Sequence, residues 1–294
     1  MKKAIILLIL FSFLFGKVNV VTSTTDLADI VKQVGGDRVM VTSIARGNQD
    51  PHYVEILPSY MMKVRKADIY FMVGLELDLW AQYIIDGSRN RKLKVVDCSV
   101  EINKMEVPIG KVDASMGDLH RFGNPHYWLD PENGKLIARM ITRELSAFDA
   151  KGQDHYNNKL ANFEQQVDLS LEKWESEFSN LVGKKIIFYH NSWPYFAARF
   201  GLKTVEFLEP KPGITPSPSK LNQIIQIIKS NDIQLIASES YFSDRVPKFI
   251  ATKTSVKTVM LAQSVGALDG IVSYFDLFET NLRILSEAYG LKND

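Results

Sequence analysis

The feature that most constrains this chain is a stretch of thirty residues, 153–182, in which apolar side chains recur at steps of three and four. The recurring residues are Tyr156, Leu160, Phe163, Val167, Leu171, Trp174, Phe178 and Leu181. This spacing puts them on one face of an α-helix, and no proline or glycine interrupts it. Such a helix would be roughly 45 Å long, about the span of a small domain. It is either a long core helix of one domain or, as we favour, a rigid helix joining two lobes with a cleft between them.

Short apolar runs alternate with helical patterns on both sides of this stretch. Before it, we expect strands at 18–22, 39–43, 69–73 and 94–96, with helices at 27–34, 59–66 and 77–86. After it, we expect strands at 185–189, 204–207, 233–237 and 256–261, with helices at 220–229, 246–252 and 271–288. Strands that alternate with helices indicate mostly parallel sheets. The predicted fold class is therefore α/β, with two α/β lobes joined by one long rigid helix.

These patterns also predict how the chain is divided. We expect a signal peptide at 1–16, an N-terminal lobe at 17–152, a linking helix at 153–182 and a C-terminal lobe at 183–294. Lys2 and Lys3 precede a mostly apolar run, 4–15, which is short for a membrane span and typical of a secretory signal. An uncleaved N-terminal anchor is the alternative.

Charge and cysteine content narrow the classes of partner. The chain has 35 Lys+Arg against 34 Asp+Glu, so no overall field attracts nucleic acid or an anionic membrane. Cys98 is the only cysteine, so the sequence predicts neither an internal disulfide nor a cysteine metal site. Because Cys98 lies far from the signal region, it cannot be a lipid-anchored first residue. Export without a lipid anchor points to the periplasm.

Three histidines occupy positions suited to ligand binding. In open α/β sheets, ligands bind beyond the carboxyl ends of the strands, and His190 ends a predicted strand. His52 and His126 each follow a proline, which stiffens the loop. Neutral imidazole is the commonest metal ligand, and three of them with one oxygen form a tetrahedral site of the zinc type. Their separations of 74 and 64 residues do not indicate whether they share a site, so the alternative is that the three histidines are unrelated. We assume that His120 and His155 are unrelated histidines of this kind.

Other chemistries have weaker support. The sequence has no glycine-rich phosphate loop, no GxSxG elbow and no HExxH motif. Asp50, Glu239 and Asp269 are candidate acid–base carboxylates, but their spacing does not pair them.

Several segments, taken in order, carry a resemblance to a known family. They are DPHYVE at 50–55, VGLE at 73–76, NPHYWLDP at 124–131, YHN at 189–191, and Tyr274-Phe275 with Asn281. Together they resemble the metal-binding receptors, or solute-binding proteins, of bacterial zinc and manganese ABC importers of the ZnuA/TroA type. The resemblance covers residues 18–290. It implies two α/β lobes joined by a long rigid helix, with the metal site in the cleft between them.

The resemblance also implies a set of ligands. His52 and His126 would come from the first lobe and His190 from the second. The fourth ligand of the family is often an aspartate in an Asp-x-x-Gly turn after the last strand, where this chain has Gln263. The fourth position could then be filled by the amide oxygen of Gln263, by Asp269, by Glu239 or by water. Asp269 is favoured among the protein groups, and Glu239 could instead accept a hydrogen bond from a ligating histidine.

The predicted function is that of a periplasmic receptor, not an enzyme, which captures a divalent transition metal and delivers it to a membrane ABC permease. The transported ion is expected to be Zn²⁺ rather than Mn²⁺, because nitrogen ligands suit zinc and oxygen ligands suit manganese. The receptor is expected to be a monomer. The alternatives are a Mn²⁺- or Fe²⁺-preferring receptor of the same family, a zinc hydrolase, and a surface adhesin.

Overall fold

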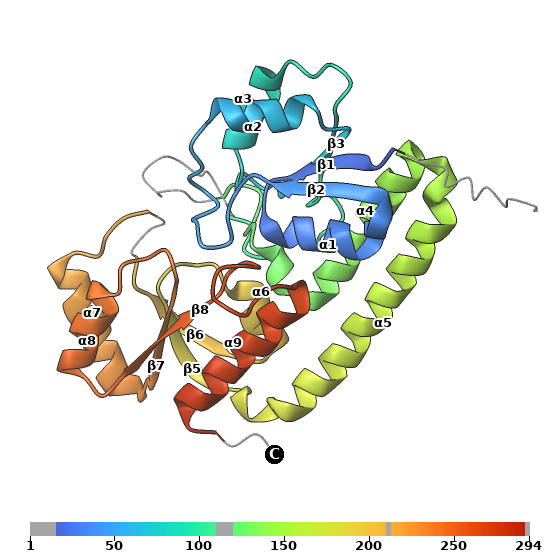
Figure 1. Ribbon diagram of the computed structural model, residues 1–294. Coiled ribbons are helices and arrows are strands. Elements are labelled where there is room, and N and C mark those ends of the chain that lie inside the picture. The colour runs from blue at the N-terminus through green and yellow to red at the C-terminus, as the bar shows by residue number, and fades with distance from the viewer. Residues whose placement is uncertain (1–15, 110–119, 210–212, 292–294) are drawn as a thin grey trace, which may run out of the picture.

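The computed structural model describes residues 16–109, 120–209 and 213–291, so the predicted signal peptide lies almost entirely outside the described residues. The strands form two sheets of four parallel strands each (Figure 1). The first sheet contains β1 (Val18–Thr22), β2 (Val39–Ser43), β3 (Ile69–Met72) and β4 (Lys94–Asp97), in the order β2-β1-β3-β4. The second contains β5 (Lys185–Phe188), β6 (Lys203–Phe207), β7 (Leu235–Glu239) and β8 (Lys257–Leu261), in the order β6-β5-β7-β8. The second sheet thus repeats the order of the first, and the predicted fold class is confirmed.

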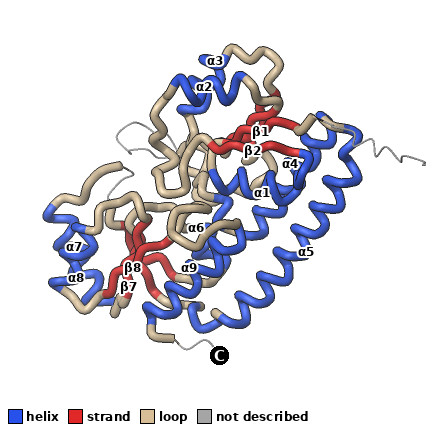
Figure 2. The backbone as a smooth tube through the Cα atoms, viewed as in Figure 1, coloured by secondary structure: helices blue, strands red, loops and turns tan. Residues whose placement is uncertain are grey.

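Helices connect the strands and cover both sheets (Figure 2). The first lobe has α1 (Thr25–Gly35), α2 (Pro58–Arg65), α3 (Trp80–Ser88) and α4 (Pro131–Phe148). The second has α6 (Pro194–Arg199), α7 (Pro218–Asn231), α8 (Arg245–Lys253) and α9 (Tyr274–Tyr289). The start of α4 follows from its sequence, because Asp130 accepts a hydrogen bond from the Glu132 N–H and proline occupies the first helical position.

The long helix α5 (Gln153–Glu177) runs along one side of the molecule, from the first sheet to the second (Figure 1). It ends at Glu177 rather than at 182, and a short 3-10 helix, Ser179–Leu181, follows. Phe178 and Leu181 are nevertheless buried. A step of three residues fits one turn of either helix type, so the apolar pattern continues past the point where the α-helix ends.

One hydrophobic core extends through both lobes. It joins residues of both sheets, among them Val20, Phe71, Ile186 and Leu235, with apolar side chains of α1, α4, α5 and α9. Two smaller clusters lie on the other faces of the sheets, under α2 and α3 in the first lobe and under α7 and α8 in the second. The helix α5 is therefore packed along its length into a core that both lobes share.

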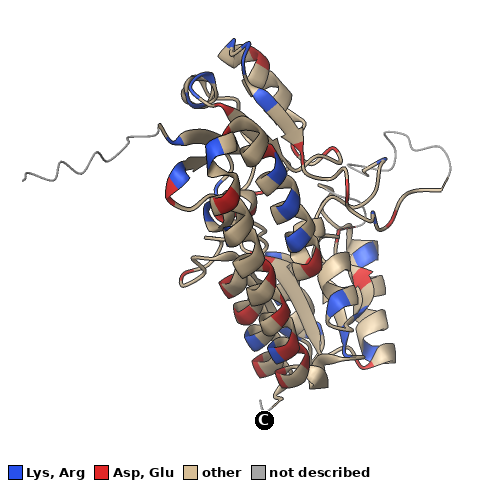
Figure 3. Cartoon of the chain, turned by 90° about the vertical axis from the view of Figure 1, so that its right-hand side faces the viewer, with Lys and Arg blue, Asp and Glu red and all other residues tan. Residues whose placement is uncertain are grey.

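The surface carries charges of both signs, and basic and acidic residues occur on the same helices (Figure 3). Within the described residues, no helix combines the length and the apolar character needed to span a membrane.

Candidate metal centre

His126 is positioned by the segment that follows it. Tyr127–Leu129 forms a 3-10 helix in which the Tyr127 hydroxyl donates to the carbonyl of Val73 (2.7 Å) and the Trp128 indole donates to the carbonyl of Gln263 (2.9 Å). The first of these bonds lies within the N-terminal lobe, and the second reaches the C-terminal lobe. The backbone beside His126 is therefore fixed to both lobes.

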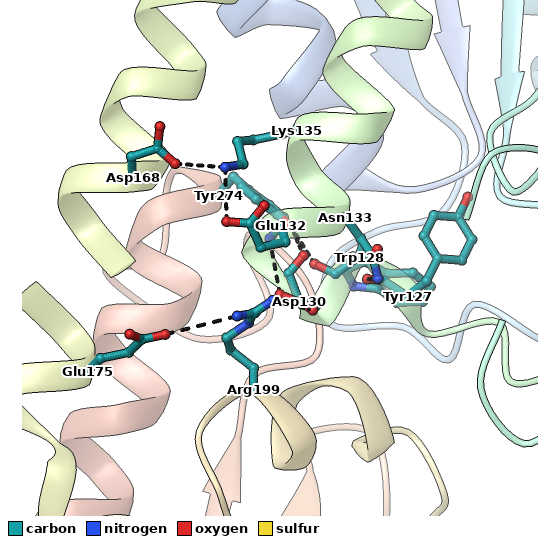
Figure 4. Close-up of polar contacts among 10 residues, drawn as sticks. All are labelled: Tyr127, Trp128, Asp130, Glu132, Asn133, Lys135, Asp168, Glu175, Arg199 and Tyr274. Atoms are coloured by element: carbon teal, nitrogen blue, oxygen red, sulfur yellow. Dashed lines mark hydrogen bonds and ion pairs between the residues drawn. The ribbon is translucent and has the colours of Figure 1, made fainter. Parts of the chain in front are cut away.

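Further contacts hold this segment where the lobes meet (Figure 4). The Arg199 guanidinium in α6 donates to both carboxylate oxygens of Asp130, at 2.8 and 3.0 Å. The Tyr274 hydroxyl at the start of α9 donates to the Trp128 carbonyl at 2.5 Å. On the side of α4 that faces α5, Lys135 pairs with Asp168 of α5 at 2.7 Å. The bonds to Asp130 and Trp128 order the segment on which His126 lies, and the Lys135–Asp168 pair joins α4 to α5.

The side chain of His126 has a defined tautomer. Asn124 Oδ1 lies 2.9 Å from His126 Nδ1 and also accepts from its backbone N–H. An amide oxygen only accepts, so the proton of the neutral ring is on Nδ1 and the lone pair is on Nε2. His126 Nε2 is buried and has no hydrogen-bond partner among the described residues. Burial, with the neighbouring histidines, lowers the pKa of His126 well below its usual value and keeps the ring neutral.

His52 lies in the loop after β2 and is held in the same way. Asp50 Oδ1 lies 2.8 Å from its Nδ1 and accepts from its backbone N–H. The Trp80 indole donates to the carbonyl of Pro51 (2.8 Å) and so fixes the loop against α3. Burial raises the pKa of the Asp50 carboxyl, but the hydrogen bonds and charge interaction with His52, together with the nearby His190, more than offset burial, and the net pKa is lowered.

His190 follows β5, and its partner follows the adjacent strand β6. Glu209 Oε2 lies 2.7 Å from His190 Nδ1, and both side chains are buried. Burial alone would lower the pKa of His190, but the bond to Glu209 and the nearby Glu239 carboxylate raise it above its usual value. A carboxylate on the far nitrogen also makes an imidazole more basic toward a metal.

The three rings converge on one point. One ligand atom from each of His52, His126 and His190 lies within 4.8 Å of the others, and the ring centroids are 5.3, 5.4 and 5.7 Å apart. In the part of the chain that the structure describes, this is the one group of at least three His, Cys, Asp or Glu side chains with that proximity. In each ring Nδ1 faces an oxygen, which leaves Nε2 for an ion. Nitrogen ligands around a tetrahedral zinc are about 3.3 Å apart, so one ion can bridge them after small movements.

A fourth imidazole, that of His120, lies beside them, although the sequence predicted an unrelated histidine at this position. His120 Nε2 is 3.2 Å from His52 Nε2, and the His120 ring centroid is 5.2 Å from that of His52 and 6.4 Å from that of His126. Arg121 fixes the backbone next to it, because its N–H and its guanidinium both donate to the Glu76 carboxylate. His155 lies apart on α5, with Nε2 3.1 Å from the carbonyl of Gly35.

The candidate oxygen ligands are placed differently. Gln263 is buried, and its Oε1 accepts a hydrogen bond from the Tyr241 hydroxyl. Asp269 is exposed on the loop between β8 and α9. Glu239 is buried at the end of β7, where burial raises its pKa to about 7. Its Oε1 accepts from the Trp193 indole at 2.9 Å.

The sequence carries a local signal for two of the partners that orient the histidines, Asp50 and Asn124. DPH at 50–52 and NPH at 124–126 have the same form, in which an Asx oxygen reaches the residue two positions later. Such a turn presents the histidine ring with Nδ1 already occupied. Glu209 had no comparable signal, because it comes from another strand.

Comparisons with known proteins show which family the chain is similar to. The family model described as zinc-uptake complex component A, periplasmic, matches residues 20–288. The chain is 27% identical over 288 residues to the metal ABC transporter substrate-binding lipoprotein FimA of Streptococcus parasanguinis, which covers 93% of this chain and 89% of that protein. It is 25% identical over 287 residues to the manganese ABC transporter substrate-binding lipoprotein PsaA of Streptococcus mitis, at 92% and 89% coverage.

The fold is also that of a solved structure. A crystal structure of ZnuA superposes with a TM-score of 0.81 at 24% identity, covering 95% of this chain and 100% of that one. Because the family model matches nearly the whole chain, this protein belongs to the ZnuA family of metal-binding, substrate-binding components of ABC transporters.

Proposed function

We propose that this protein captures Zn²⁺ between its two lobes with Nε2 of His52, His126 and His190, and delivers it to a membrane ABC permease. The observation that carries the proposal is His126 Nε2, a buried lone pair without a hydrogen-bond partner among the described residues. Leaving a buried polar atom unpaired is unfavourable by about 1–3 kcal/mol, and an ion bound there removes that penalty.

We further propose His120 as the fourth ligand. Its Nε2 is 3.2 Å from that of His52, close to the separation of about 3.3 Å between two nitrogens on one tetrahedral zinc. Asp269, the oxygen ligand favoured from the sequence, is exposed, and the Gln263 oxygen is engaged by Tyr241. Four imidazoles would form a closed site, without the open position that a hydrolytic zinc needs for activated water. The proposed role is therefore binding and transfer rather than catalysis.

Manganese is the second candidate, since the PsaA relative is named for it. It would need oxygen ligands, which Glu239 is best placed to supply from beside His190. A shell made only of imidazoles binds zinc much more tightly than manganese, whereas a shell of mixed nitrogen and oxygen ligands reduces the difference in affinity between the two ions.

Competitive titration of the metal-free protein distinguishes the two. We expect Zn²⁺ to bind with a Kd at least about 100-fold lower than that of Mn²⁺. X-ray absorption spectroscopy of the zinc form should show four nitrogen ligands at about 2.0–2.1 Å. Equal affinity for the two ions, or a shell with two or more carboxylate oxygens, would reject the zinc assignment.

We also propose that the protein is exported to the periplasm by the signal segment at 1–16. The basic and apolar pattern of residues 2–15 supports this, as does the description of the family as periplasmic. Cell fractionation checks it: the mature protein should appear with periplasmic markers, and replacing the apolar run with polar residues should retain it in the cytoplasm.

A further inference from the structure

A single carboxylate joins the two lobes beside the histidines. Glu106 Oε2 accepts from Asn124 Nδ2 at 3.0 Å and from Asn191 Nδ2 at 2.8 Å. Asn124 belongs to the N-terminal lobe and Asn191 to the C-terminal lobe. The Asn124 amide also donates to the backbone carbonyl of Asn191 at 2.8 Å. One side chain therefore contacts both sides of the interface directly.

Each of these asparagines is tied to a histidine of the candidate metal centre. Asn124 Oδ1 accepts from His126 Nδ1, so the position of the Asn124 amide sets the orientation of that ring. Asn191 directly follows His190 in the chain. Moving the two asparagines apart would thus separate a ligand of one lobe from a ligand of the other.

A second contact holds the segment that carries Glu106. The Tyr195 hydroxyl in α6 accepts from the Met105 N–H and donates to the Asn124 carbonyl, both at 3.0 Å. Glu106 itself has a φ of +54°, in the left-handed region that non-glycine residues seldom adopt. Since that backbone conformation is unfavourable by itself, the bonds around it must maintain it.

We propose that Glu106 is a positioning residue that acts as a latch between the lobes and slows release of the bound metal. The inference rests on the proposed metal-binding function and adds a kinetic role that the ligands themselves do not provide. Glu106 is exposed, so a docking partner can reach its carboxylate while His126 and His190 stay buried. Release would then require the bonds from Asn124 and Asn191 to break before the ligands separate.

The test is the rate at which a chelator in excess removes Zn²⁺ from the full-length protein, measured by stopped flow. We expect release from Glu106→Ala to be about 10-fold faster than from the wild type, because two hydrogen bonds to a charged group are lost. Glu106→Gln should lie between them, since its amide oxygen still accepts. The zinc association rate and the melting temperature of the metal-free protein should stay close to wild type.

Two further variants sharpen the test. Asn191→Ala removes the hydrogen bond from the C-terminal lobe to Glu106 and should also accelerate zinc release. The double variant Glu106→Ala/Asn191→Ala should release zinc little faster than Glu106→Ala alone. Glu101→Ala is the matched control, because this exposed carboxylate on the same segment bonds Arg143 within its own lobe (2.7 Å).

The outcomes separate the two proposals. A wild-type protein that binds no metal would reject the proposed function. A protein that binds Zn²⁺ tightly but releases it equally fast with or without the Glu106 carboxylate would reject the latch alone. Equal acceleration by Glu101→Ala would also reject it, because the effect would then not depend on the contact between lobes.

Discussion

Glu209 Oε2 lies 2.7 Å from His190 Nδ1, and the two side chains are only 6% and 7% exposed. This buried pair comes from the ends of adjacent strands, β6 and β5. The carboxylate holds the ring with Nε2 toward the other histidines, and it helps to raise the pKa of His190 above its usual value.

We predict that Glu209→Gln weakens zinc binding by about 10-fold at pH 8. The pKa of His190 should fall without the carboxylate, so protons compete with zinc only at lower pH. The pH at which half of the affinity is lost should therefore move downward. Titrations at several pH values check this. An unchanged midpoint would show that Glu209 does not control the protonation of His190.

Replacing the proposed ligands should separate the histidines into two groups. His52→Ala, His126→Ala and His190→Ala should each weaken zinc binding at least 10- to 100-fold. Replacing a residue that only hydrogen-bonds a metal ligand typically causes a loss of this size already. His155→Ala is the control, because its ring contacts the Gly35 carbonyl on another part of the surface. Comparable losses for His155→Ala would mean that the site lies elsewhere.

His120 should behave as a fourth ligand that depends on its anchor. We expect His120→Ala to weaken zinc binding by about 10-fold, a smaller loss than at the three other positions. Glu76→Ala should weaken binding in the same direction, since Glu76 accepts from both the N–H and the guanidinium of Arg121. Isothermal titration at pH 7.5 measures both. Wild-type affinity in His120→Ala would exclude it and return the fourth position to an oxygen or water.

Asp26 provides a test of stability rather than of binding. Its carboxyl in α1 accepts from the Val265 N–H at 2.9 Å, and burial raises its pKa from 3.8 to about 7. The folded protein therefore binds a proton more readily than the unfolded chain, and stability is lost as pH rises from 3.8 through 7. Asp26→Asn keeps an oxygen acceptor without the charge. We expect it to stabilise the metal-free protein by about 2–3 kcal/mol more at pH 8 than at pH 5.

Urea unfolding at the two pH values gives this difference directly. Glu279→Gln is a suitable control because its carboxylate is substantially exposed. If Asp26→Asn destabilises the protein equally at both pH values, the ionised Asp26 carboxylate is well accommodated in the folded protein, and the prediction is wrong.

Local patterns in the sequence accounted for the parts of the fold that depend on local chemistry. Alternating strands and helices indicated two parallel sheets, and Asp130-Pro131 marked the start of α4. The convergence of His52, His126 and His190 also agrees with the principle that ligands gather at the carboxyl ends of parallel strands.

Other features depend on pairings between distant segments. Glu209 meets His190 because β6 lies beside β5, and His120 reaches His52 across 68 residues. No local period or spacing encodes either contact. The end of α5 was also ambiguous, because a three-residue apolar step from Phe178 to Leu181 suits both helix types.

The core that runs without interruption through both sheets has a consequence for how the protein melts. Side chains of α5 and α9 pack in the same cluster as Phe71 of the first sheet and Phe188 of the second. Neither lobe can therefore retain its packed core when the other lobe unfolds. Calorimetry should therefore show one cooperative transition for the chain, with matching van't Hoff and calorimetric enthalpies. Added Zn²⁺ should shift that single peak upward as a whole rather than split it.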